Sequence, residues 1–503
     1  MRYPGLIALF VGAISAFAFQ PTGWWPLMPL AIALLSALIW QAKSLRQSLA
    51  IGWAFGLGQF CVGLNWIQFA FTFQDKMPHW LGYLAVVLLS LYLAVYPALA
   101  AGLAWRFKGE RPLALVLALA GGWALTEWLR ATMFTGFPWN PLGVVLDDTD
   151  LLHTAAYVGT YGLSALVVAA GGMLWLFTQR RWKAGGAILV VIVLLHFPPV
   201  PALAPASGKQ IRVVQPNIGQ EEKWRPGLAD EAFARLHGLS AGGAPPPRLL
   251  LWPEVAVPVP FEILGSDRRP LPVPLAAIPK ALESVRPGDV LVTGAFALIA
   301  DDSGRIAGET NSVFALDETG HILGRYDKAH LVPYGEYLPM RPLLSRIGLS
   351  QLAPGEGDTA YGPGPQTIDV PGFGRMGVQV CYEIIFSGEV VDRRNRPDFI
   401  FNPSNDAWFG RWGPPQHLAQ ARLRAAEEGI PVIRSTPTGI SAVVDAHGRI
   451  VKSLAWRTPG IIDSALPPPA AAPTLFGRFG NVIPLLLGFA LLIGGIVLGV
   501  RRR

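Results

Sequence analysis

Eight long apolar stretches divide this 503-residue chain into a membrane-like part and one long polar segment. The stretches cover residues 4–19, 24–40, 49–72, 80–105, 112–129, 155–177, 184–200 and 481–500. A helix needs about 20 apolar residues to cross the hydrocarbon core of a bilayer. The first and seventh stretches are marginal in length by this measure, and the others are adequate. The pattern predicts a polytopic α-helical membrane bundle with eight spans.

The Lys and Arg residues of the short connections predict the orientation of these spans. With a cytoplasmic N-terminus, the inner connections hold twelve such residues and the short outer ones hold only Lys76 and Arg130. The twelve are Arg2, Lys43, Arg46, Arg106, Lys108, Arg111, Arg180, Arg181, Lys183 and Arg501 to Arg503. Under the positive-inside rule, this bias predicts cytoplasmic termini. We therefore expect seven spans in residues 1–200, an extracytoplasmic domain at 208–466 and an eighth span at 481–500.

The net charge of +7 follows mostly from this topology. No basic stripe with interleaved aromatic residues is present, so the sequence does not predict nucleic-acid binding. One alternative concerns the start of the chain. Arg2, the short apolar run and the small residues at 16–18 also resemble a secretory signal peptide. We expect this segment to remain as a span, because several long spans follow it and the basic region holds a single Arg.

The polar segment alternates between strand-like and helix-like patterns. Short β-branched and aliphatic runs occur at 211–218, 249–257, 290–300, 312–317, 375–384, 397–405, 430–436 and 440–448. Helical spacing occurs at 230–241 and 417–429, and Glu127 and Arg130 in the fifth span are spaced to pair along a helix. Alternating strands and helices predict a mixed α/β domain with a buried sheet. A domain of this length can bury a full core without disulfides.

The two cysteines, Cys61 and Cys381, lie in the third span and in the polar segment, so we do not expect a disulfide between them. An unpaired thiol in an oxidising compartment calls for a chemical explanation. The alternative is a buried Cys that acts as a small hydrophobic residue. The chain has no P-loop, no dinucleotide fingerprint and no metal-ligand spacing among its eight His residues. The sequence therefore predicts neither a metal nor a cofactor.

Three motifs place a carboxylate, an amine and a thiol at or just past apolar runs that read as strands. They are WPE with Glu254, RYDKAHLVPYGEYLP with Lys328, and CYE with Cys381. A thiol becomes a strong nucleophile once a base removes its proton, and Glu254 is the candidate base. Lys328 is expected to stabilise the oxyanion together with a backbone N–H, that of Tyr382. Taken singly, each charged residue would be read as a solvated surface group.

Together, these motifs resemble the Glu-Lys-Cys triad of the nitrilase superfamily. With VVQPNIGQEEKW, YGEYLP, NPSNDAWFG and the eight spans, the chain resembles that superfamily's membrane-embedded apolipoprotein N-acyltransferase family. The resemblance implies an αββα sandwich on the periplasmic side of a bacterial inner membrane. It implies that Cys381 takes a fatty acyl group from a phospholipid, usually phosphatidylethanolamine, as a thioester. The acceptor would be the α-amino group of diacylglyceryl-cysteine at an apolipoprotein N-terminus.

The resemblance also assigns supporting residues. Glu336 is expected to position the lysine, and Glu383 matches a second family glutamate near the cysteine. Aromatic residues at family positions that line the substrate region are Trp224, Tyr334, Tyr382 and Trp408. Trp139 is expected to contact lipid from the membrane side, although most aromatic residues simply pack. Residues 338–352 are amphipathic and basic, which favours either a lipid-facing arm over the site or an ordinary domain helix.

Three other functions remain open from the residues alone. A membrane-anchored amidohydrolase of the same superfamily would resolve the acyl-enzyme with water, but one span would suffice to anchor it. A transporter with an accessory outer domain is disfavoured, because the spans hold few of the intramembrane charges that mark a translocation path. An inactive binding relative is disfavoured by the intact triad.

Overall fold

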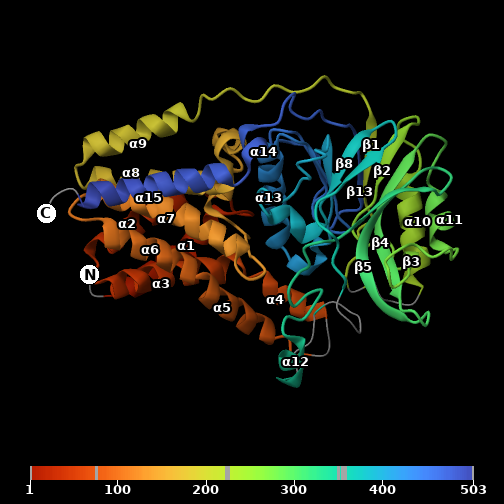
Figure 1. Ribbon diagram of the computed structural model, residues 1–503, viewed down its shortest axis with the longest axis horizontal. Helices are drawn as coiled ribbons and strands as arrows, with labels where there is room; N and C mark the ends of the chain where they lie inside the picture. Colours follow the sequence, from red (N-terminus) through yellow and green to blue (C-terminus); the bar gives the residue numbers. More distant parts are fainter. Residues whose placement is uncertain are drawn as a thin grey trace.

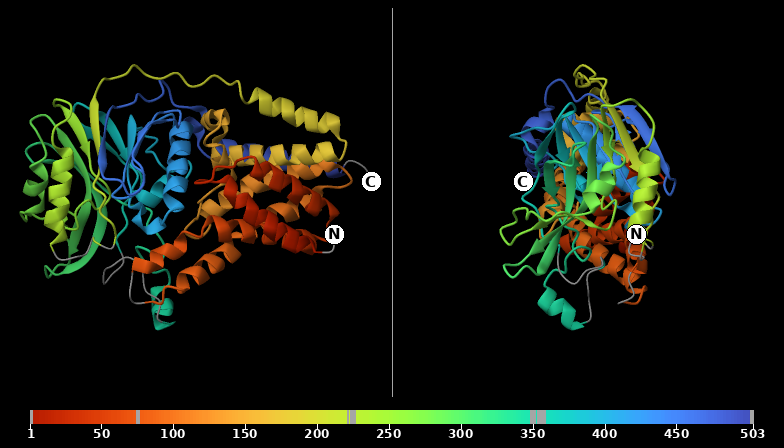
Figure 2. Two further views of the ribbon diagram at one scale, coloured as in Figure 1. Left: turned by 180° about the vertical axis from the view of Figure 1, so that it is seen from behind. Right: turned by 90° about the vertical axis from the view of Figure 1, so that its right-hand side faces the viewer.

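The computed structural model describes residues 3–73, 77–220, 222, 227–347, 352 and 359–500. The N-terminal helices and the last helix lie side by side at one end of the molecule, and the strands form the other end (Figure 1). The chain passes from the helices to the strands along one side, where Leu203 and Ala470 of the two linkers form a β-bridge (Figure 2). Along the chain, the strands therefore lie between the N-terminal helices and the last helix.

Every apolar stretch of the sequence forms helix. The helices of this part are α1 Pro4–Ser15, α2 Leu27–Gln41, α3 Leu45–Gly63, α4 Ile67–Ala70, α5 Leu81–Leu93, α6 Val95–Phe107, α7 Pro112–Thr132, α8 Ala155–Thr178, α9 Trp182–Leu194 and α15 Val482–Val500. Within the described residues, four helical stretches are long and apolar enough to span a membrane, namely Leu81–Phe107, Pro112–Thr132, Asp150–Thr178 and Val482–Val500. A fifth is the pair Leu45–Gly63 and Ile67–Phe73, bent by 48°. Shorter apolar helices cover Pro4–Ala18, Leu27–Gln41 and Trp182–Leu194. Eight membrane crossings stay a prediction.

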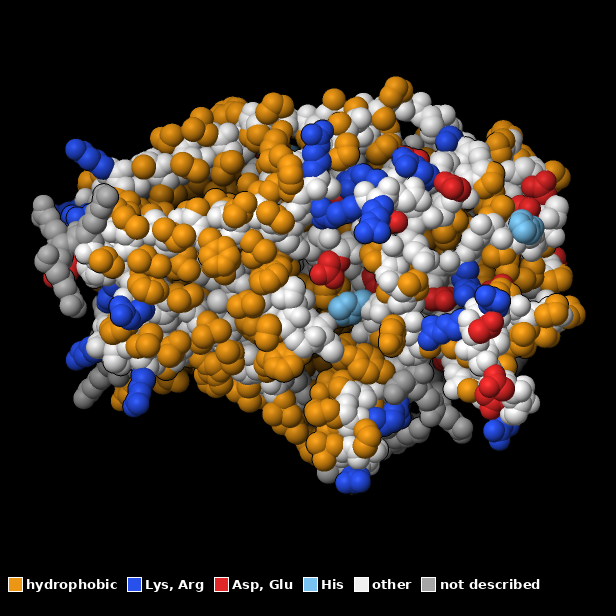
Figure 3. All heavy atoms as spheres, viewed as in Figure 1, with side chains coloured by type: hydrophobic (Ala, Val, Ile, Leu, Met, Phe, Trp, Pro, Cys, Tyr) orange, Lys and Arg blue, Asp and Glu red, His pale blue; other side chains and the backbone are white. Residues whose placement is uncertain are grey.

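Small residues allow these helices to approach closely. A Cβ atom on Gly121 of α7 would lie 2.4 Å from the carbonyl oxygen of Gly488 in α15, and one on Gly58 of α3 would lie 2.0 Å from that of Leu9 in α1. Backbone contact of this kind is typical of helix packing in lipid, where burial of apolar surface gives no driving force between helices. The outer surface is rich in apolar side chains (Figure 3). Exposed examples are Leu6, Phe10, Leu34, Leu88, Val190 and Leu486.

The strands form two sheets. The first has the order β13-β1-β2-β4-β5-β6 with β3 also paired to β4, and the second has the order β12-β11-β10-β9-β8-β7. The strands are β1 Gln210–Gln215, β2 Arg248–Leu251, β3 Pro260–Leu264, β4 Val290–Ala300, β5 Ile306–Leu316, β6 Ile322–Asp327, β7 Thr367–Val370, β8 Gly374–Val378, β9 Phe399–Pro403, β10 Val432–Ser435, β11 Ala442–Val444, β12 Ile450–Ser453 and β13 Gly460–Ala465. The central strands β1, β2 and β4 are parallel, as are β8, β9 and β10. Parallel strands buried on both faces explain the continuous apolar runs of the sequence.

Helices cover the outer faces of both sheets. Helices α10 Leu228–Ser240 and α11 Ala277–Leu282 pack on the first sheet, and α13 Gly413–Glu428 lies on the second. Apolar side chains of both sheets form the core between them. The predicted αββα sandwich is therefore confirmed, and both predicted helices, 230–241 and 417–429, are present with boundaries that differ by a few residues.

Helix α13 also joins the sandwich to the helical part. One face of α13, with Leu418 and Ala421, belongs to the core of the sandwich, and the other, with Ala419 and Leu423, packs with the bundle. The Glu427 carboxylate accepts hydrogen bonds from the backbone and side chain of Thr160 in α8, at 2.5 and 2.6 Å. The two parts therefore share a buried apolar and polar interface.

Basic residues gather at the end of the bundle opposite the sandwich (Figures 1 and 3). The Lys108 ammonium donates to the Trp40 carbonyl, and the Trp105 indole N–H donates to the Ala42 carbonyl. These contacts bring the ends of α2 and α6 together, and both chain ends lie at the same end of the molecule (Figure 1). Lys108, one of the residues that the charge pattern assigns to the inner side, thus lies at this end of the structure.

Candidate active site

The structure brings Glu254, Lys328 and Cys381 together between the two sheets. Glu254 follows β2 by three residues, Lys328 directly follows β6, and Cys381 follows β8 by three residues. Their exposed fractions are 5%, 1% and 4%. The Lys328 Nζ lies 3.6 Å from Glu254 Oε1, and the charges of both residues act on the Cys381 thiol. Glu254, Lys328 and Cys381 are therefore buried together as one cluster, and none of them is a solvated surface group.

Two carboxylates and an amide hold the lysine. Lys328 Nζ donates to Glu336 Oε1 at 2.9 Å, and Asn311 Nδ2 donates to Glu254 Oε1 at 2.7 Å and to Glu336 Oε1 at 3.3 Å. Burial opposes the positive charge of Lys328, but Glu336 and then Glu254 outweigh it and raise the pKa of the ammonium above its ordinary value. The lysine is therefore cationic at neutral pH. Asn311 lies inside β5, and no sequence motif pointed to it.

The backbone at Cys381 is strained. Its φ of 52° lies in the left-handed region, which a residue with a Cβ seldom adopts. Cys381 opens the 3-10 helix η6 Cys381–Ile385, and its carbonyl oxygen lies 3.0 Å from His417 Nε2. His417 of α13 therefore contacts the backbone of the turn at the cysteine itself.

The electrostatic environment keeps the thiol protonated in the resting site. Burial and then the charge of Glu254 raise the pKa of Cys381 well above its ordinary value. The Lys328 charge and a hydrogen bond from the backbone of Asn405 oppose this rise. Since the thiolate is the nucleophilic form, reaction requires transfer of the thiol proton to a neighbouring base. Glu254 is the carboxylate whose charge raises the pKa of the Cys381 thiol most.

Glu383 joins the lysine loop to the cysteine turn. Four groups donate to its carboxylate: Tyr326 Oη at 2.8 Å, Ala329 N at 2.7 Å, His330 N at 3.0 Å and Val380 N at 2.7 Å. Three of these donors flank Lys328 and the fourth precedes Cys381. Burial raises the pKa of Glu383, and the backbone hydrogen bonds act against this effect. Glu383 thus ties the loop that carries Lys328 to the residue that precedes Cys381.

A buried polar network that the sequence did not predict supports the cysteine turn. Asp406 accepts two hydrogen bonds from Arg434 Nη2, both at 2.6 Å, and lies 2.9 Å from His417 Nδ1. Burial and then the Arg434 charge lower the pKa of His417, so its ring is neutral when it contacts the Cys381 carbonyl. Of the residues that the structure describes, no group of three or more His, Cys, Asp and Glu is placed to hold a metal ion.

The predicted aromatic residues have different surroundings. Tyr382 is buried and donates to the Gly136 carbonyl at 3.2 Å, whereas Tyr334 is 49% exposed beside the site. Trp408 is half-buried and meets the ring of Phe73 edge-on. Trp139 is fully buried, with its indole N–H donating to Gln416 Oε1 at 2.8 Å. Their substrate roles stay predictions, and Trp224 lies outside the described residues.

Residues 338–347 project from the sandwich beside the bundle. The short helix α12 Arg341–Leu344 stands apart from both sheets (Figure 1). Met340 is 65% exposed and Leu343 is 56% exposed, so these two apolar side chains of the predicted amphipathic segment do not pack on the sandwich. Residues 348–351 of that segment lie outside the described residues. The lipid-facing arm and the ordinary domain helix both stay predictions for residues 338–352.

Comparisons with known proteins agree with both parts of the fold. Residues 11–173 match the family model for the apolipoprotein N-acyltransferase N-terminal domain, and residues 210–474 match the model for carbon-nitrogen hydrolases. The solved structure of Nit3 from Saccharomyces cerevisiae, a member of the nitrilase superfamily, is 20% identical with a TM-score of 0.38. That match covers 52% of this chain and 90% of Nit3.

Two curated relatives match almost the whole chain. The apolipoprotein N-acyltransferase of Rhodopseudomonas palustris is 34% identical, over 95% of this chain and 92% of the relative. That of Bradyrhizobium diazoefficiens is 36% identical, over 99% of this chain and 95% of the relative. These matches extend over both the helical part and the sandwich. The chain belongs to the apolipoprotein N-acyltransferase family and is an acyltransferase enzyme.

Proposed function

We propose that Cys381 accepts a fatty acyl group from a phospholipid and passes it to the α-amino group of diacylglyceryl-cysteine at an apolipoprotein N-terminus. Phosphatidylethanolamine is the proposed donor. The observation that carries the proposal is the buried cluster of Glu254, Lys328 and Cys381 set against an apolar helical bundle. The intermediate is a thioester, so the reaction runs in two half-reactions at one site.

The first half-reaction forms the thioester. Glu254 takes the thiol proton as the sulfur of Cys381 attacks the ester carbonyl carbon of the donor. Lys328 and the backbone N–H of Tyr382 stabilise the oxyanion. When the tetrahedral species collapses, the carbon–oxygen ester bond breaks. The lysophospholipid alkoxide leaves with the proton from Glu254.

The second half-reaction forms the amide. The α-amino group of the acceptor attacks the thioester carbonyl carbon and gives a proton to Glu254. Collapse breaks the carbon–sulfur bond, and the sulfur of Cys381 recovers the proton. A thioester is activated toward amines, so neither ATP nor a cofactor is needed. Both substrates are anchored in the bilayer, which confines them near the site.

The proposed setting is the inner membrane of a bacterium, crossed by eight spans. Both termini would be cytoplasmic and the sandwich periplasmic. Support comes from the clustering of Lys108 and other basic residues at the end of the bundle far from the sandwich. A transporter is not supported, because the chain belongs to a family of acyltransferases.

Mass spectrometry after exposure of the full-length protein to phosphatidylethanolamine alone tests the proposal. A transferase should accumulate one acyl group on Cys381 with release of one lysophospholipid per protein. The matched control is Cys61→Ala, which should still form the adduct because Cys61 lies in α3. Continuous release of fatty acid would favour the amidohydrolase. Absence of any adduct on Cys381 during turnover would reject the thioester.

Glu254→Gln is predicted to separate thiol ionisation from catalysis. Glu254 raises the pKa of Cys381, and Lys328 lowers it. Loss of the Glu254 charge should therefore lower the pKa of the thiol, and the pH profile of its alkylation by iodoacetamide should move to lower pH. Acyl transfer should nonetheless fall by about 10²–10⁴-fold, because the general base is lost. Glu318→Gln, at an exposed carboxylate, is the control. An alkaline shift, or wild-type transfer, would contradict the assigned role.

The exposed side of residues 338–347 is proposed to contact lipid beside the site. Leu343→Ser should raise KM for phosphatidylethanolamine in vesicles several-fold and leave alkylation of Cys381 unchanged, since the side chain is 56% exposed. Ile306→Ser is the matched control, because Ile306 is 53% exposed elsewhere on the sandwich. Equal KM values for phosphatidylethanolamine in the two variants would show that Leu343 does not contact the lipid substrate.

A further inference from the structure

The connection between α7 and the 3-10 helix η3 Leu142–Leu146 lies against the candidate site. Two of its carbonyl groups accept hydrogen bonds from residues beside the triad: Tyr382 Oη donates to Gly136 at 3.2 Å, and His330 Nε2 lies 2.8 Å from the Thr135 oxygen. Tyr382 adjoins the cysteine in the sequence, and His330 is two residues from the lysine. The connection, residues 133–141, therefore contacts both catalytic loops.

Arg130 in the last turn of α7 holds this connection from the membrane side. Its Nη1 donates to the carbonyl oxygens of Phe137 at 3.0 Å and Trp139 at 2.8 Å, and the Phe137 N–H donates back to the Arg130 carbonyl at 2.9 Å. The turn between them is tight, because Gly136 has a φ of 71° and a Cβ there would lie 2.1 Å from the Ala131 oxygen. Arg130 thus holds the carbonyls of Phe137 and Trp139, just after the carbonyls of Thr135 and Gly136 that contact the site.

Glu127, one turn earlier, holds the far end of the connection. Its Oε1 accepts from the backbone N–H of Leu142 at 2.9 Å and lies 3.9 Å from Arg130 Nη2, which confirms the predicted pairing. Arg130 is 2% exposed and Glu127 is 5% exposed. Charged residues are costly in a bundle of this kind and usually serve function. Here the pair anchors both ends of the connection to one turn of α7.

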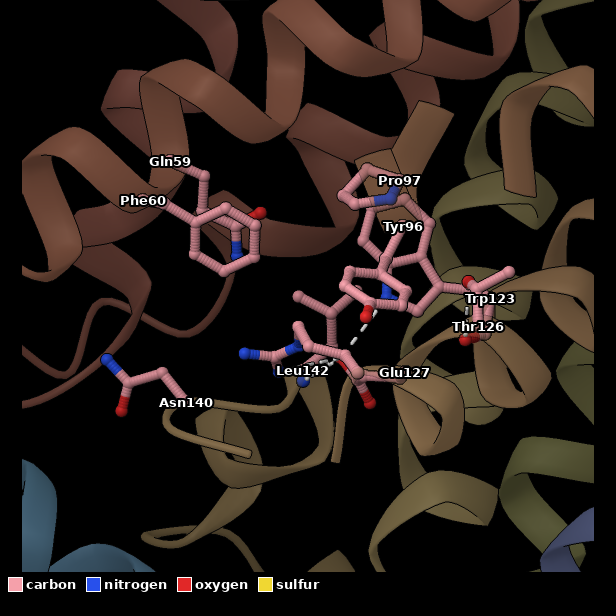
Figure 4. Close-up of a pocket in the computed structure, with 10 residues that line it drawn as sticks. Gln59, Phe60, Tyr96, Pro97, Trp123, Thr126, Glu127, Asn140 and Leu142 are labelled. Atoms are coloured by element: carbon pink, nitrogen blue, oxygen red, sulfur yellow. Dashed lines mark hydrogen bonds and ion pairs between the residues drawn. The ribbon is translucent and has the colours of Figure 1, made fainter. Parts of the chain in front are cut away.

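A small polar cavity lies beside this pair (Figure 4). Its volume is about 10 Å³, enough for one water molecule. Three lining residues carry buried polar atoms that have no hydrogen-bond partner among the residues the structure describes: Gln59 Oε1, Glu127 Oε2 and the amide of Asn140. The contact between Glu127 and Arg130 is therefore enclosed beside other buried polar groups.

We infer that Arg130 is a positioning residue for acyl transfer, acting through residues 133–141 on the loops that carry Cys381 and Lys328. The inference rests on the proposed function, because it takes Cys381 as the reacting thiol. Displacement of a reacting group by about 1 Å can cost about 10²-fold in rate. Hydrogen bonds from Arg130 on one side and from Tyr382 and His330 on the other hold residues 133–141. These bonds would limit displacement of the two catalytic loops.

Arg130→Gln in the full-length protein, reconstituted in phosphatidylethanolamine vesicles, tests the inference. We expect kcat to fall by about 10²-fold with KM for the donor within about threefold of wild type. Loosening Lys328 from the thiol should also move the pH profile of Cys381 alkylation to higher pH, because Lys328 lowers the pKa of that thiol. Arg130→Lys, which keeps the charge and a donor, should restore part of the loss. The matched control is Arg111→Gln at the other, exposed end of α7, with wild-type behaviour expected.

A double-mutant cycle decides whether the effect travels through the connection. Tyr382→Phe removes the hydrogen bond to the carbonyl of Gly136, which directly precedes Phe137. If both residues act through residues 133–141, Arg130→Gln combined with Tyr382→Phe should lose little more than Arg130→Gln alone. Losses that multiply would show independent action and overturn the inference.

Failure of Arg130→Gln to accumulate in the membrane leaves the inference testable. Tyr382→Phe and His330→Phe, the latter keeping the ring stacked on Phe386, each remove one contact of the connection. Both should slow alkylation of Cys381, and wild-type alkylation in both would overturn the inference. Alkylation requires no acyl transfer, so this outcome is distinct from failure of the proposed function, which absence of a thioester on wild-type Cys381 would reveal.

Discussion

Cys381→Ala is expected to lose acyl transfer by at least about 10⁴-fold, the scale seen when a covalent nucleophile is removed. The acyl adduct should vanish together with turnover, because no other described thiol lies in the sandwich. The variant should fold, since alanine fills most of the volume of a cysteine that is already enclosed by η6 and α13. The measurements are apolipoprotein N-acylation in vesicles and intact-protein mass.

The control for Cys381→Ala is Cys61→Ala, with transfer near the wild-type rate. Thermal unfolding of both variants would separate a chemical effect from misfolding. An alanine variant that acylates lipoprotein at the normal rate would reject every role that we assign to the sulfur. An acyl adduct on another residue would instead identify that residue as the nucleophile.

Lys328→Met should lower both activity and stability. The methionine keeps the aliphatic stem but removes the cation, so the oxyanion loses a donor, at a cost of about 10²–10³-fold in kcat. Glu254 and Glu336 would then face each other without the ammonium that lies 3.6 and 2.9 Å from them. Removing one partner from a buried ionic cluster costs about 3–5 kcal/mol of unfolding free energy.

The pH dependence of Lys328→Met has a defined sign. In the wild type, the raised pKa of Lys328 means that its stabilising charge is present below the unfolded-state pKa and is lost only as pH rises through the folded value. In the variant, proton uptake by one of the two facing carboxyl groups relieves their repulsion, so the melting temperature should rise on mild acidification. Lys280→Met is the matched control, because Lys280 pairs with Asp230 at the surface with its side chain 49% exposed. Equal stability of the two variants would contradict the buried cluster.

Local patterns were sufficient for much of the fold. The run at 290–300 coincides with β4, and the run at 430–436 contains β10, because strands buried on both faces are written as continuous apolar residues. Strand β12, Ile450–Ser453, was missed since all four of its residues are exposed and carry no such pattern. The short strand β7 was missed for a similar reason, with polar residues alternating at an edge.

Only part of the candidate site could be predicted from the sequence. Glu254, Lys328 and Cys381 each stand in a motif, so a family resemblance found them. The sequence did not single out Arg434, in a strand-like run, or His417, in a helix-like run. A polar residue in such a run is ordinarily interpreted as a surface position. The NPSNDAWFG motif, which contains Asp406, was the available signal. Asp406 contacts His417, 11 residues later, and Arg434, 28 residues later, only when α13 and β10 pack beside it.

Sequence alone determined which segments are apolar helices, which are buried strands, and that a thiol, a carboxylate and an amine accompany them. These properties follow from composition and period, which act over a few residues. Tertiary structure decided that Glu383 joins the lysine loop to the cysteine turn and that Arg130 holds residues 133–141 against both. Glu383 and Ala329 are more than 50 residues apart in the chain. Arg130 reaches its acceptors across a tight turn, and no local sequence pattern predicts the path of that turn. Only the packed chain brings these donors and acceptors within hydrogen-bond distance.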